Sequence, residues 1–398
     1  MGTTDSSSGT GSNGDRSGRG ATVAESIVAV SRRFFQQVVL PILEREFPEA
    51  ASQAAFGIFG LGSEAYGLDD ALSRDHHWGL RIDAVLPDAL YLRDEGRLRT
   101  ELPGYLPHEF EGQSLREGHV AGAGLAPESL PAFLRRSVGL VDVPASDEEW
   151  LQLPEEDVIH ILNGELWHDP SGEFTRIRAG YAAYYPDAVW RRRIAHWCRY
   201  YSGMGVYALQ RALLRQNELY AATAFGKAIR WGVQLAFLLD RTYFPYDKWL
   251  WSAFTRLPRL YEPLGPLVEE AVRGATGWER KLELLNAISE VLDRALVADG
   301  LIRAHPQFRG SPTSGYRLLE HAYAELSRPC RSACRQWSRC GIRSTWSNST
   351  PGTSAGWIRT AGTTCFAWSR SARKDRRSPR VDTGTLSAPY LVARRGPQ

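Results

Sequence analysis

The sequence predicts an α+β chain in which a mixed sheet with helices is followed by an all-α helical bundle domain. The apolar run at 54–61 stops at Gly62, which predicts a buried strand leading into a turn. A second run, at 75–84, alternates in the way that a half-buried strand does. After Pro186 apolar residues recur at helical spacing in one segment after another, and this predicts the bundle.

The 398 residues are enough for two ordinary domains. Residues 1–21 are mostly Gly, Ser, Thr, Asp and Asn, so we expect disorder there. We place the α/β domain at 22–185 and the helical domain at 186–327. Residues 328–398 form a basic tail in which hydrophobic periodicity disappears and which we also expect to be disordered.

The charge is distributed unevenly along the chain. Residues 328–398 carry a net charge of +12, whereas residues 1–327 carry −9. An acidic folded part argues against a nucleic-acid surface. The tail is either a basic interaction arm or a coding sequence read out of frame, and its scattered Trp and Cys favour the second. Its C-x3-C-x5-C spacing matches no common zinc module.

The chain has no apolar stretch long enough to cross a bilayer and no apolar signal segment at its start. We therefore expect a cytoplasmic protein without a membrane partner. The sequence leaves the oligomeric state open.

The first element is a helix at 23–47, where apolar residues recur every three to four positions. Pro41 should kink this helix or divide it, and Pro48 should end it. The strands at 54–61 and 75–84 follow. In the second strand one face should pack on a core: His76, Trp78, Leu80, Ile82 and Ala84. The other face should look into a cleft: Asp75, His77, Gly79, Arg81 and Asp83.

Residues 86–150 are rich in Pro, Gly and charge, and predict short strands, loops and one helix near 130–138. The segment 159–167 fits a strand or a helix equally well. The helical domain is predicted to contain helices at 188–214, 219–239, 246–257, 260–272 and 278–299.

The stretch from Gly62 to Trp78 has the layout that nucleotidyl transfer needs. A Gly-Ser turn after a buried strand offers backbone N–H groups and a small hydroxyl to a triphosphate. Asp75 opens the next strand, where residues i and i+2 share a face and can hold a metal between them. Magnesium prefers hard oxygen ligands for that task.

Here the sequence resembles a known group of proteins. The stretch GSEAYGLDDALSRDHHWGLRID is similar to the polymerase-β-like nucleotidyltransferase superfamily and, more closely, to the family called domain of unknown function 4037. Further resemblance lies in LNGELWHDPSGEFTRIR, YYPDAVWRRRIAHW and LAFLLDRTYFPYDKWLWSAFTRLP, so that it covers roughly residues 25–325. It implies a nucleotidyltransferase-like fold.

The resemblance also implies roles for individual residues. Gly62 and Ser63 would bind the triphosphate of an NTP, and Asp75 would be a catalytic ligand of Mg²⁺ or Mn²⁺. His77 would be the second catalytic metal ligand, in a modified form, since it stands where the superfamily has a second carboxylate. Imidazole is a poor ligand for magnesium and a better one for manganese or zinc. Either the site uses another metal or only one, or a nearby carboxylate such as Asp69, Asp70 or Glu64 compensates, or the fold binds nucleotide without turning it over.

Other residues have a functional and a structural interpretation. Arg74 and Lys248 are candidates to bind phosphate, but Arg74 could instead pair with an acid of its own domain. The pair Asp69 and Asp70 could be part of the site or cap a helix. Candidates for a third carboxylate are Asp142, Glu165 and Asp169, with Glu218 as a candidate general base.

Two hypotheses follow. In the first, the protein is a metal-dependent nucleotidyltransferase that moves a nucleoside monophosphate from an NTP to a hydroxyl of a small molecule or protein. In the second, it is a catalytically degenerate version of the fold that acts as a nucleotide-binding or regulatory module, which the replacement at His77 favours.

Overall fold

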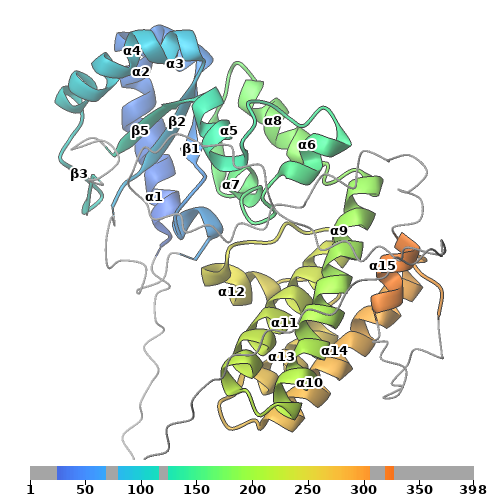
Figure 1. Ribbon diagram of the computed structural model, residues 1–398. Helices are drawn as coiled ribbons and strands as arrows, with labels where there is room; N and C mark the ends of the chain where they lie inside the picture. The colour runs from blue at the N-terminus through green and yellow to red at the C-terminus, as the bar shows by residue number, and fades with distance from the viewer. Residues whose placement is uncertain (1–24, 69–78, 116–123, 305–318, 327–398) are drawn as a thin grey trace, which may run out of the picture. The chain divides into compact units, whose positions relative to one another are not determined.

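The computed structural model describes residues 25–68, 79–115, 124–304 and 319–326. All of them belong to one compact unit, Met1–Ser349. Within them the α+β prediction is confirmed, because a small mixed sheet is accompanied by many helices (Figure 1). Residues 1–21 and the basic tail lie outside the described residues. The disorder predicted for both segments, and the change of reading frame predicted for the tail, therefore stay predictions.

The central sheet has four strands in the order β5-β2-β1-β6. β1 (Ala55–Ile58) pairs antiparallel with both β2 (Ile82–Leu86) and β6 (Glu165–His168). β2 pairs in parallel with β5 (Leu125–Ser129). A separate two-stranded ribbon joins β3 (Glu109–Phe110) and β4 (Gln113–Ser114).

The two predicted strands are present but shorter. The strand predicted at 54–61 is confirmed as β1. Residues 59–61 of the predicted run belong to the turn that follows it. The second strand extends from Ile82 to Leu86, and not from Asp75, while residues 69–78 lie outside the described part. The predicted core face is confirmed where it can be followed, since Leu80, Ile82 and Ala84 are buried in one cluster.

One face of the sheet is covered by the first helices. These are α1 (Ile27–Phe34), α2 (Leu40–Glu46), α3 (Pro48–Gln53) and α4 (Asp88–Thr100), which share a hydrophobic cluster with Phe56 of β1 (Figure 1). A π-helical turn, Phe35–Val39, joins α1 to α2. It precedes Pro41, whose missing N–H removes one helical hydrogen bond.

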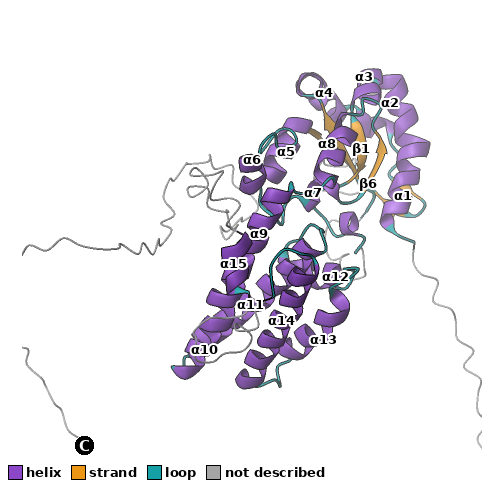
Figure 2. Cartoon of the chain, turned by 90° about the vertical axis from the view of Figure 1, so that its right-hand side faces the viewer, coloured by secondary structure: helices purple, strands orange, loops and turns teal. Residues whose placement is uncertain are grey.

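The opposite face is covered by α5 (Leu130–Val138), α6 (Asp147–Gln152), α7 (Ile159–Leu162) and α8 (Glu173–Ala182) (Figure 2). The predicted helix near 130–138 is confirmed as α5. The segment 159–167 contains both alternatives, because α7 is followed directly by β6. The sequence analysis did not predict α4, α6 or α8.

The helical part follows the predicted periodicity closely. A long helix is formed by α9 (Asp187–Arg199), a π-helical segment (Tyr200–Val206) and α10 (Tyr207–Leu214). It is followed by α11 (Glu218–Leu239), α12 (Leu250–Phe254), α13 (Tyr261–Val272), α14 (Trp278–Ala298) and α15 (Glu320–Leu326). In the described residues no helix is both long and apolar enough to cross a membrane. The boundary at 185/186 stays a prediction.

A buried ion pair connects α9 to the segment before α7. Arg193 is fully buried and donates a hydrogen bond to Glu155, and its other nitrogen donates to the carbonyl oxygen atoms of Trp150 and Leu153 at 2.8 and 3.0 Å. Glu155 also accepts hydrogen bonds from Trp197 and Gln234. One carboxylate therefore joins side chains of α9 and α11 to the α6–α7 connection.

We expect Glu155→Ala to lower the free energy of unfolding by about 3–5 kcal/mol, because Arg193 would remain as an unpaired buried charge. Urea unfolding measures this quantity. The double variant Glu155→Leu/Arg193→Met should lose less, since it leaves no charge behind. Glu95→Ala, which breaks the more exposed pair with Arg99, is the control and should change stability by less than about 1 kcal/mol. Equal losses in Glu155→Ala and Glu95→Ala would contradict this account.

Candidate functional site

The candidate site is the Gly-Ser turn that follows β1. The chain leaves the strand at Phe59 and enters a short 3-10 helix, Glu64–Tyr66. Gly62 has a φ of +118°, a backbone conformation that residues with a side chain rarely adopt. A Cβ atom at Gly62 would also lie 2.5 Å from a guanidinium nitrogen of Arg81. Both constraints require glycine beside Ser63.

The side chain of Arg81 fixes the conformation of this turn. Its guanidinium donates hydrogen bonds to the carbonyl oxygen atoms of Phe59 (2.9 Å) and Leu61 (2.7 Å), at the beginning of the turn. It also pairs with Glu64 at 2.9 Å and with Asp83 at 2.8 Å. Asp83 in turn accepts the amide N–H of Phe59 at 2.9 Å. The turn is thereby fixed to β2 by side chains as well as by the sheet.

The network corrects one expectation about β2. Arg81 and Asp83 do lie on the face opposite the core face, as predicted. That face is not open at these two residues, because Arg81 is 5% exposed and Asp83 is 9% exposed. Burial alone would lower the pKa of Arg81, but Asp83 and Glu64 outweigh that effect and raise it. Arg81 is therefore a permanent cation.

The Asn163–Gly164 pair fixes the other side of the turn. Asn163 accepts the amide N–H of Gly60 at 2.9 Å and donates to the carbonyl oxygen of Gly60 at 2.6 Å. Gly164 has a φ of +69°, and a Cβ atom there would lie 1.8 Å from the carbonyl oxygen of Ile58. The LNGELW motif thus brings its backbone against the end of β1.

Aromatic residues of the helical part contact the turn at Tyr66. The ring of Tyr66 stacks on Trp249 and meets Tyr246 edge to face, with centroids 6.2 and 5.9 Å apart. Trp249 donates a hydrogen bond to the hydroxyl of Tyr246. The ammonium group of Lys248 lies 4.7 Å from the centre of the Trp249 ring. The PYDKW motif, residues 245–249, therefore contacts Tyr66, which is three positions after Ser63 in the sequence. Lys248 belongs to this motif.

Two titratable groups adjoin this aromatic cluster. His160 packs against Tyr66 and Tyr246, and burial, assisted by Arg136, lowers its pKa to about 4. Burial, assisted by Glu156, raises the pKa of Asp157 to about 6. The ring nitrogen Nδ1 of His160 is 3.8 Å from the carboxylate of Asp157. Both groups are consequently neutral between pH 4 and 6.

The structure brings together only part of the predicted site. Gly62 and Ser63 are described and form the turn, and Lys248 is described beside Trp249, whose ring stacks on Tyr66. The predicted catalytic and metal ligands Asp75 and His77 lie outside the described residues, together with Arg74, Asp69, Asp70, His76 and Trp78. In the ranges that are described, no group of three or more His, Cys, Asp or Glu side chains could hold a metal ion.

The candidate third carboxylates have structural partners. Asp142 pairs with Arg176 on the surface, and Asp169 accepts the amide N–H of Thr175 in α8. Glu165, on β6, accepts a hydrogen bond from Trp167 and pairs with Arg32. Glu218 is exposed in the first turn of α11. These contacts give no support to the prediction that one of these residues is the third carboxylate or the general base of the site.

Three residues that fix the turn were not singled out by the sequence analysis: Arg81, Asn163 and Tyr66. Alternation placed Arg81 on the correct face, but the sequence gives no indication of its partners. Asn163 stood inside a recognised motif, where an Asn-Gly pair also fits an ordinary turn.

One comparison with known proteins, the scan against family models, agrees with part of the resemblance described above. Residues 150–250 match the family model described as Domain of unknown function (DUF4037), which confirms that resemblance over this segment. A search of curated proteins finds no match. Among solved structures, the chain is similar to a nucleotidyltransferase-like protein from Exiguobacterium sibiricum 255-15, with 11% sequence identity and a TM-score of 0.35. That similarity covers 66% of this chain and 77% of the other.

Gly164→Ala should destabilise the protein far more than Gly172→Ala. Both glycines have nearly the same positive φ, but a Cβ at Gly172 would meet no atom within 4 Å. We expect a loss of about 1–2 kcal/mol for Gly172→Ala from backbone strain alone. Gly164→Ala should lose at least about 3 kcal/mol more, because β1 and the turn must move. Chemical denaturation of both variants checks this, and similar losses would show that the close approach to Ile58 is unimportant.

His160 should make stability depend on pH. Its pKa is about 4 in the folded chain and 6.5 when unperturbed, so the unfolded state binds more protons between these values. The free energy of unfolding should therefore fall by about 3 kcal/mol from this group as the pH is lowered from 6.5 to 4. His160→Gln should remove that part of the pH dependence in urea titrations at pH 7 and 4.5.

The exposed His108 provides the control for this experiment. His108→Gln, an exposed surface substitution, should change the free energy of unfolding at pH 7 by less than about 0.5 kcal/mol. If His160→Gln and the unaltered protein lose the same stability between pH 7 and 4.5, His160 is not the buried neutral group described here.

Proposed function

We propose that this chain is a metal-dependent nucleotidyltransferase that moves a nucleoside monophosphate from an NTP to a hydroxyl of a small molecule or a protein. The observation that carries the proposal is the turn at Gly62 and Ser63, held rigidly at the end of β1. Asp75 and His77 follow this turn in the sequence at the spacing that the reaction needs.

The backbone of the turn is suited to bind phosphate oxygens. Within the described part of the chain, the amide N–H groups of Gly62 and Ser63 donate no hydrogen bond. They precede a 3-10 helix, whose first N–H groups point outward. The Ser63 hydroxyl makes only a long contact of 3.4 Å with Glu64, which it can exchange for a phosphate oxygen.

In the proposed reaction, the acceptor hydroxyl oxygen attacks the α-phosphorus. The bond from that phosphorus to the α,β-bridging oxygen breaks, pyrophosphate leaves, and the hydroxyl proton passes to solvent. We assign the triphosphate to Gly62 and Ser63 and the metal to Asp75 and His77. A bound divalent ion supplies charge neutralisation on the phosphates. The protein's own contribution is positioning by a turn that does not have to reorganise.

The metal would have to be held by the segment after the turn. The two carboxylates that the structure places against the turn, Glu64 and Asp83, are both bound to Arg81. With one carboxylate and one imidazole at Asp75 and His77, manganese is the better match than magnesium.

Lys248 is proposed to contact the triphosphate from the helical part. Its ammonium group rests on Trp249, which stacks on Tyr66. In the described residues Lys248 forms no ion pair with a carboxylate, so its charge is not already compensated. Arg74, next to Asp75 in the sequence, is assigned the same role.

The second candidate function is a nucleotide-binding or regulatory module without turnover. The sequence observation that favours it is His77, because the missing carboxylate removes one negative charge from the metal site. Binding of NTP by such a module would use the same turn.

Asp75→Ala should lower kcat/KM for pyrophosphate release by at least about 100-fold, because a metal ligand is lost. Ser63→Ala should lower it by about 10-fold, the value of one hydrogen bond to a charged group. His77→Asp should raise the rate with Mg²⁺ relative to Mn²⁺. The measurement is a pyrophosphate-release screen over four NTPs, both metals and pooled metabolites.

Ser52→Ala, on the exposed side of α3, is the control and should have no effect. Thermal unfolding with NTP and metal separates the two functions. A shift in melting temperature without pyrophosphate release, not rescued by His77→Asp, would support the binding module. Full activity of Asp75→Ala would remove the basis of the transferase proposal.

A further inference from the structure

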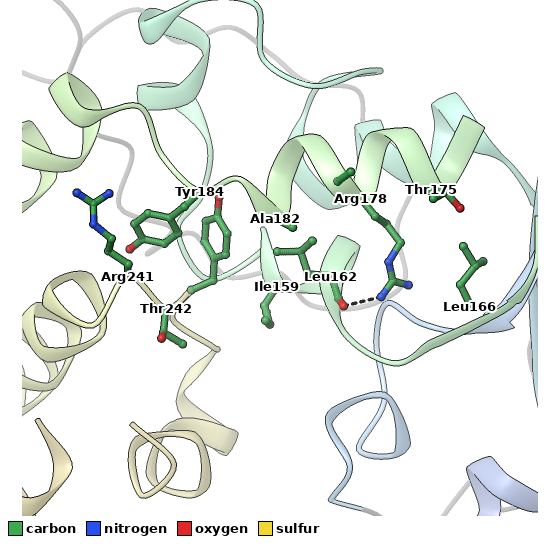
Figure 3. A pocket seen from close by; sticks show the side chains of 11 residues that line it. Ile159, Leu162, Leu166, Thr175, Arg178, Ala182, Tyr184, Arg241 and Thr242 are labelled. Atoms are coloured by element: carbon green, nitrogen blue, oxygen red, sulfur yellow. Dashed lines mark hydrogen bonds between the residues drawn. The ribbon is translucent and has the colours of Figure 1, made fainter. Parts of the chain in front are cut away.

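A cavity whose lining residues include neither Gly62 nor Ser63 lies between α7, α8 and the chain that follows α11. Its volume is about 590 Å³, within the range of small-molecule sites. Its wall is largely apolar and includes Ile159, Leu162, Leu166 and Ala182 (Figure 3). The polar groups at this wall are few, and two of them have unusual surroundings.

The first is Arg178, whose side chain extends from α8 to the end of α7 (Figure 3). It donates one hydrogen bond, to the carbonyl oxygen of Leu162 at 2.7 Å, and it lies over the ring of Phe174. Its Nη1 atom is buried and has no hydrogen-bond partner among the described residues. Burial lowers the pKa of Arg178, and no neighbouring carboxylate opposes that effect.

The second is Tyr184, which is 9% exposed and whose hydroxyl is likewise buried without a partner in the part of the chain that is described.

No carboxylate of the described residues forms an ion pair with Arg178. The second arginine at the cavity, Arg241, is stacked 3.8 Å over Trp190 and is near Asp187. Among the described residues that line the cavity, none is Asp or Glu.

Arg178 is half-buried, and a charge in such apolar surroundings destabilises a protein unless a negative group pairs with it. In most proteins a carboxylate of the chain does so, as Glu155 does for Arg193 here. At Arg178 the chain supplies apolar walls and an open volume instead. This arrangement is suited to a ligand that brings the negative charge itself.

We propose that this cavity binds a small organic acid, with its carboxylate on Arg178 and an apolar, preferably aromatic, body against Ile159, Leu162 and Ala182. A single guanidinium balances a single negative charge. A phosphate monoester carries about −1.5 to −2 charges at neutral pH and would leave an excess in an apolar wall. The carboxylate is therefore the better match. The site is separate from the Gly-Ser turn and does not depend on nucleotidyl transfer.

The test compares three probes that share one apolar body: 2-naphthoate, 2-naphthyl phosphate and the neutral 2-naphthalenemethanol. Binding to the full chain is measured by isothermal titration calorimetry. We expect 2-naphthoate to bind most tightly of the three. Arg178→Gln, which keeps a donor for Leu162, should weaken 2-naphthoate by about 10- to 100-fold and leave the alcohol unchanged.

Arg176→Gln is the matched control, since Arg176 is exposed on the same helix and pairs with Asp142 and Glu173. It should bind 2-naphthoate as the unaltered protein does. Ala179→Phe should block binding while Arg178 stays in place, which keeps the test valid if Arg178→Gln folds poorly. Unchanged affinity in Arg178→Gln and Ala179→Phe would overturn the site. Tighter binding of the phosphate would overturn the assignment of a carboxylate.

Discussion

The position of the Gly-Ser turn depends on one buried side chain, Arg81. A strand that ends in a glycine-rich turn has carbonyl groups without partners, and a buried carbonyl must find a donor. Arg81 supplies that donor twice, at Phe59 and Leu61, and is itself neutralised by Asp83 and Glu64. Asp83 then accepts the amide N–H of Phe59, so that the network satisfies both backbone groups of Phe59 and the carbonyl of Leu61. The turn can thus present the backbone of Gly62 and Ser63 without relying on a ligand for its shape.

The motifs that resemble the family are largely explained by how they hold this turn. Asn163 and Gly164 fix Gly60 and Ile58 from the side of β6. The PYDKW motif contacts Tyr66 through Trp249, and Asp247 within it pairs with Arg230 of α11. Arg193 and Trp197 of the YYPDAVWRRRIAHW motif share Glu155 with Gln234. The first two motifs therefore contact the turn and the residues beside it, whereas the third joins α9 and α11 to the connection between α6 and α7.

Periodicity predicted the elements that bury a regular stripe. α11 and α14 were located within one or two residues, and the alternation at 80–84 gave the correct faces of β2. It failed for α4, whose buried positions are few and include the charged Asp94, and for α8, which buries three residues within a polar segment. The cleft predicted beside Arg81 and Asp83 was wrong at these residues for a different reason. Their partners, Phe59, Leu61 and Glu64, are distant in the sequence, and only the folded chain brings them close.

The charged side chains around the turn determine whether a polyphosphate would need a metal ion in order to bind there. Arg81 contributes one positive charge, while Glu64 and Asp83 contribute two negative ones, so the buried side chains beneath Ser63 carry a net charge of −1. A polyphosphate approaching this turn meets favourable amide dipoles but an unfavourable net charge, and in a partly buried site the second effect is not screened by salt. Binding therefore requires additional cations at the same place. Lys248, whose ammonium group lies over Trp249, is the cation that we propose from the helical part, and a divalent ion at the proposed ligands Asp75 and His77 would be the larger contribution. If the proposed function is correct, a nucleotide that arrives with its metal should therefore bind better than one that arrives alone.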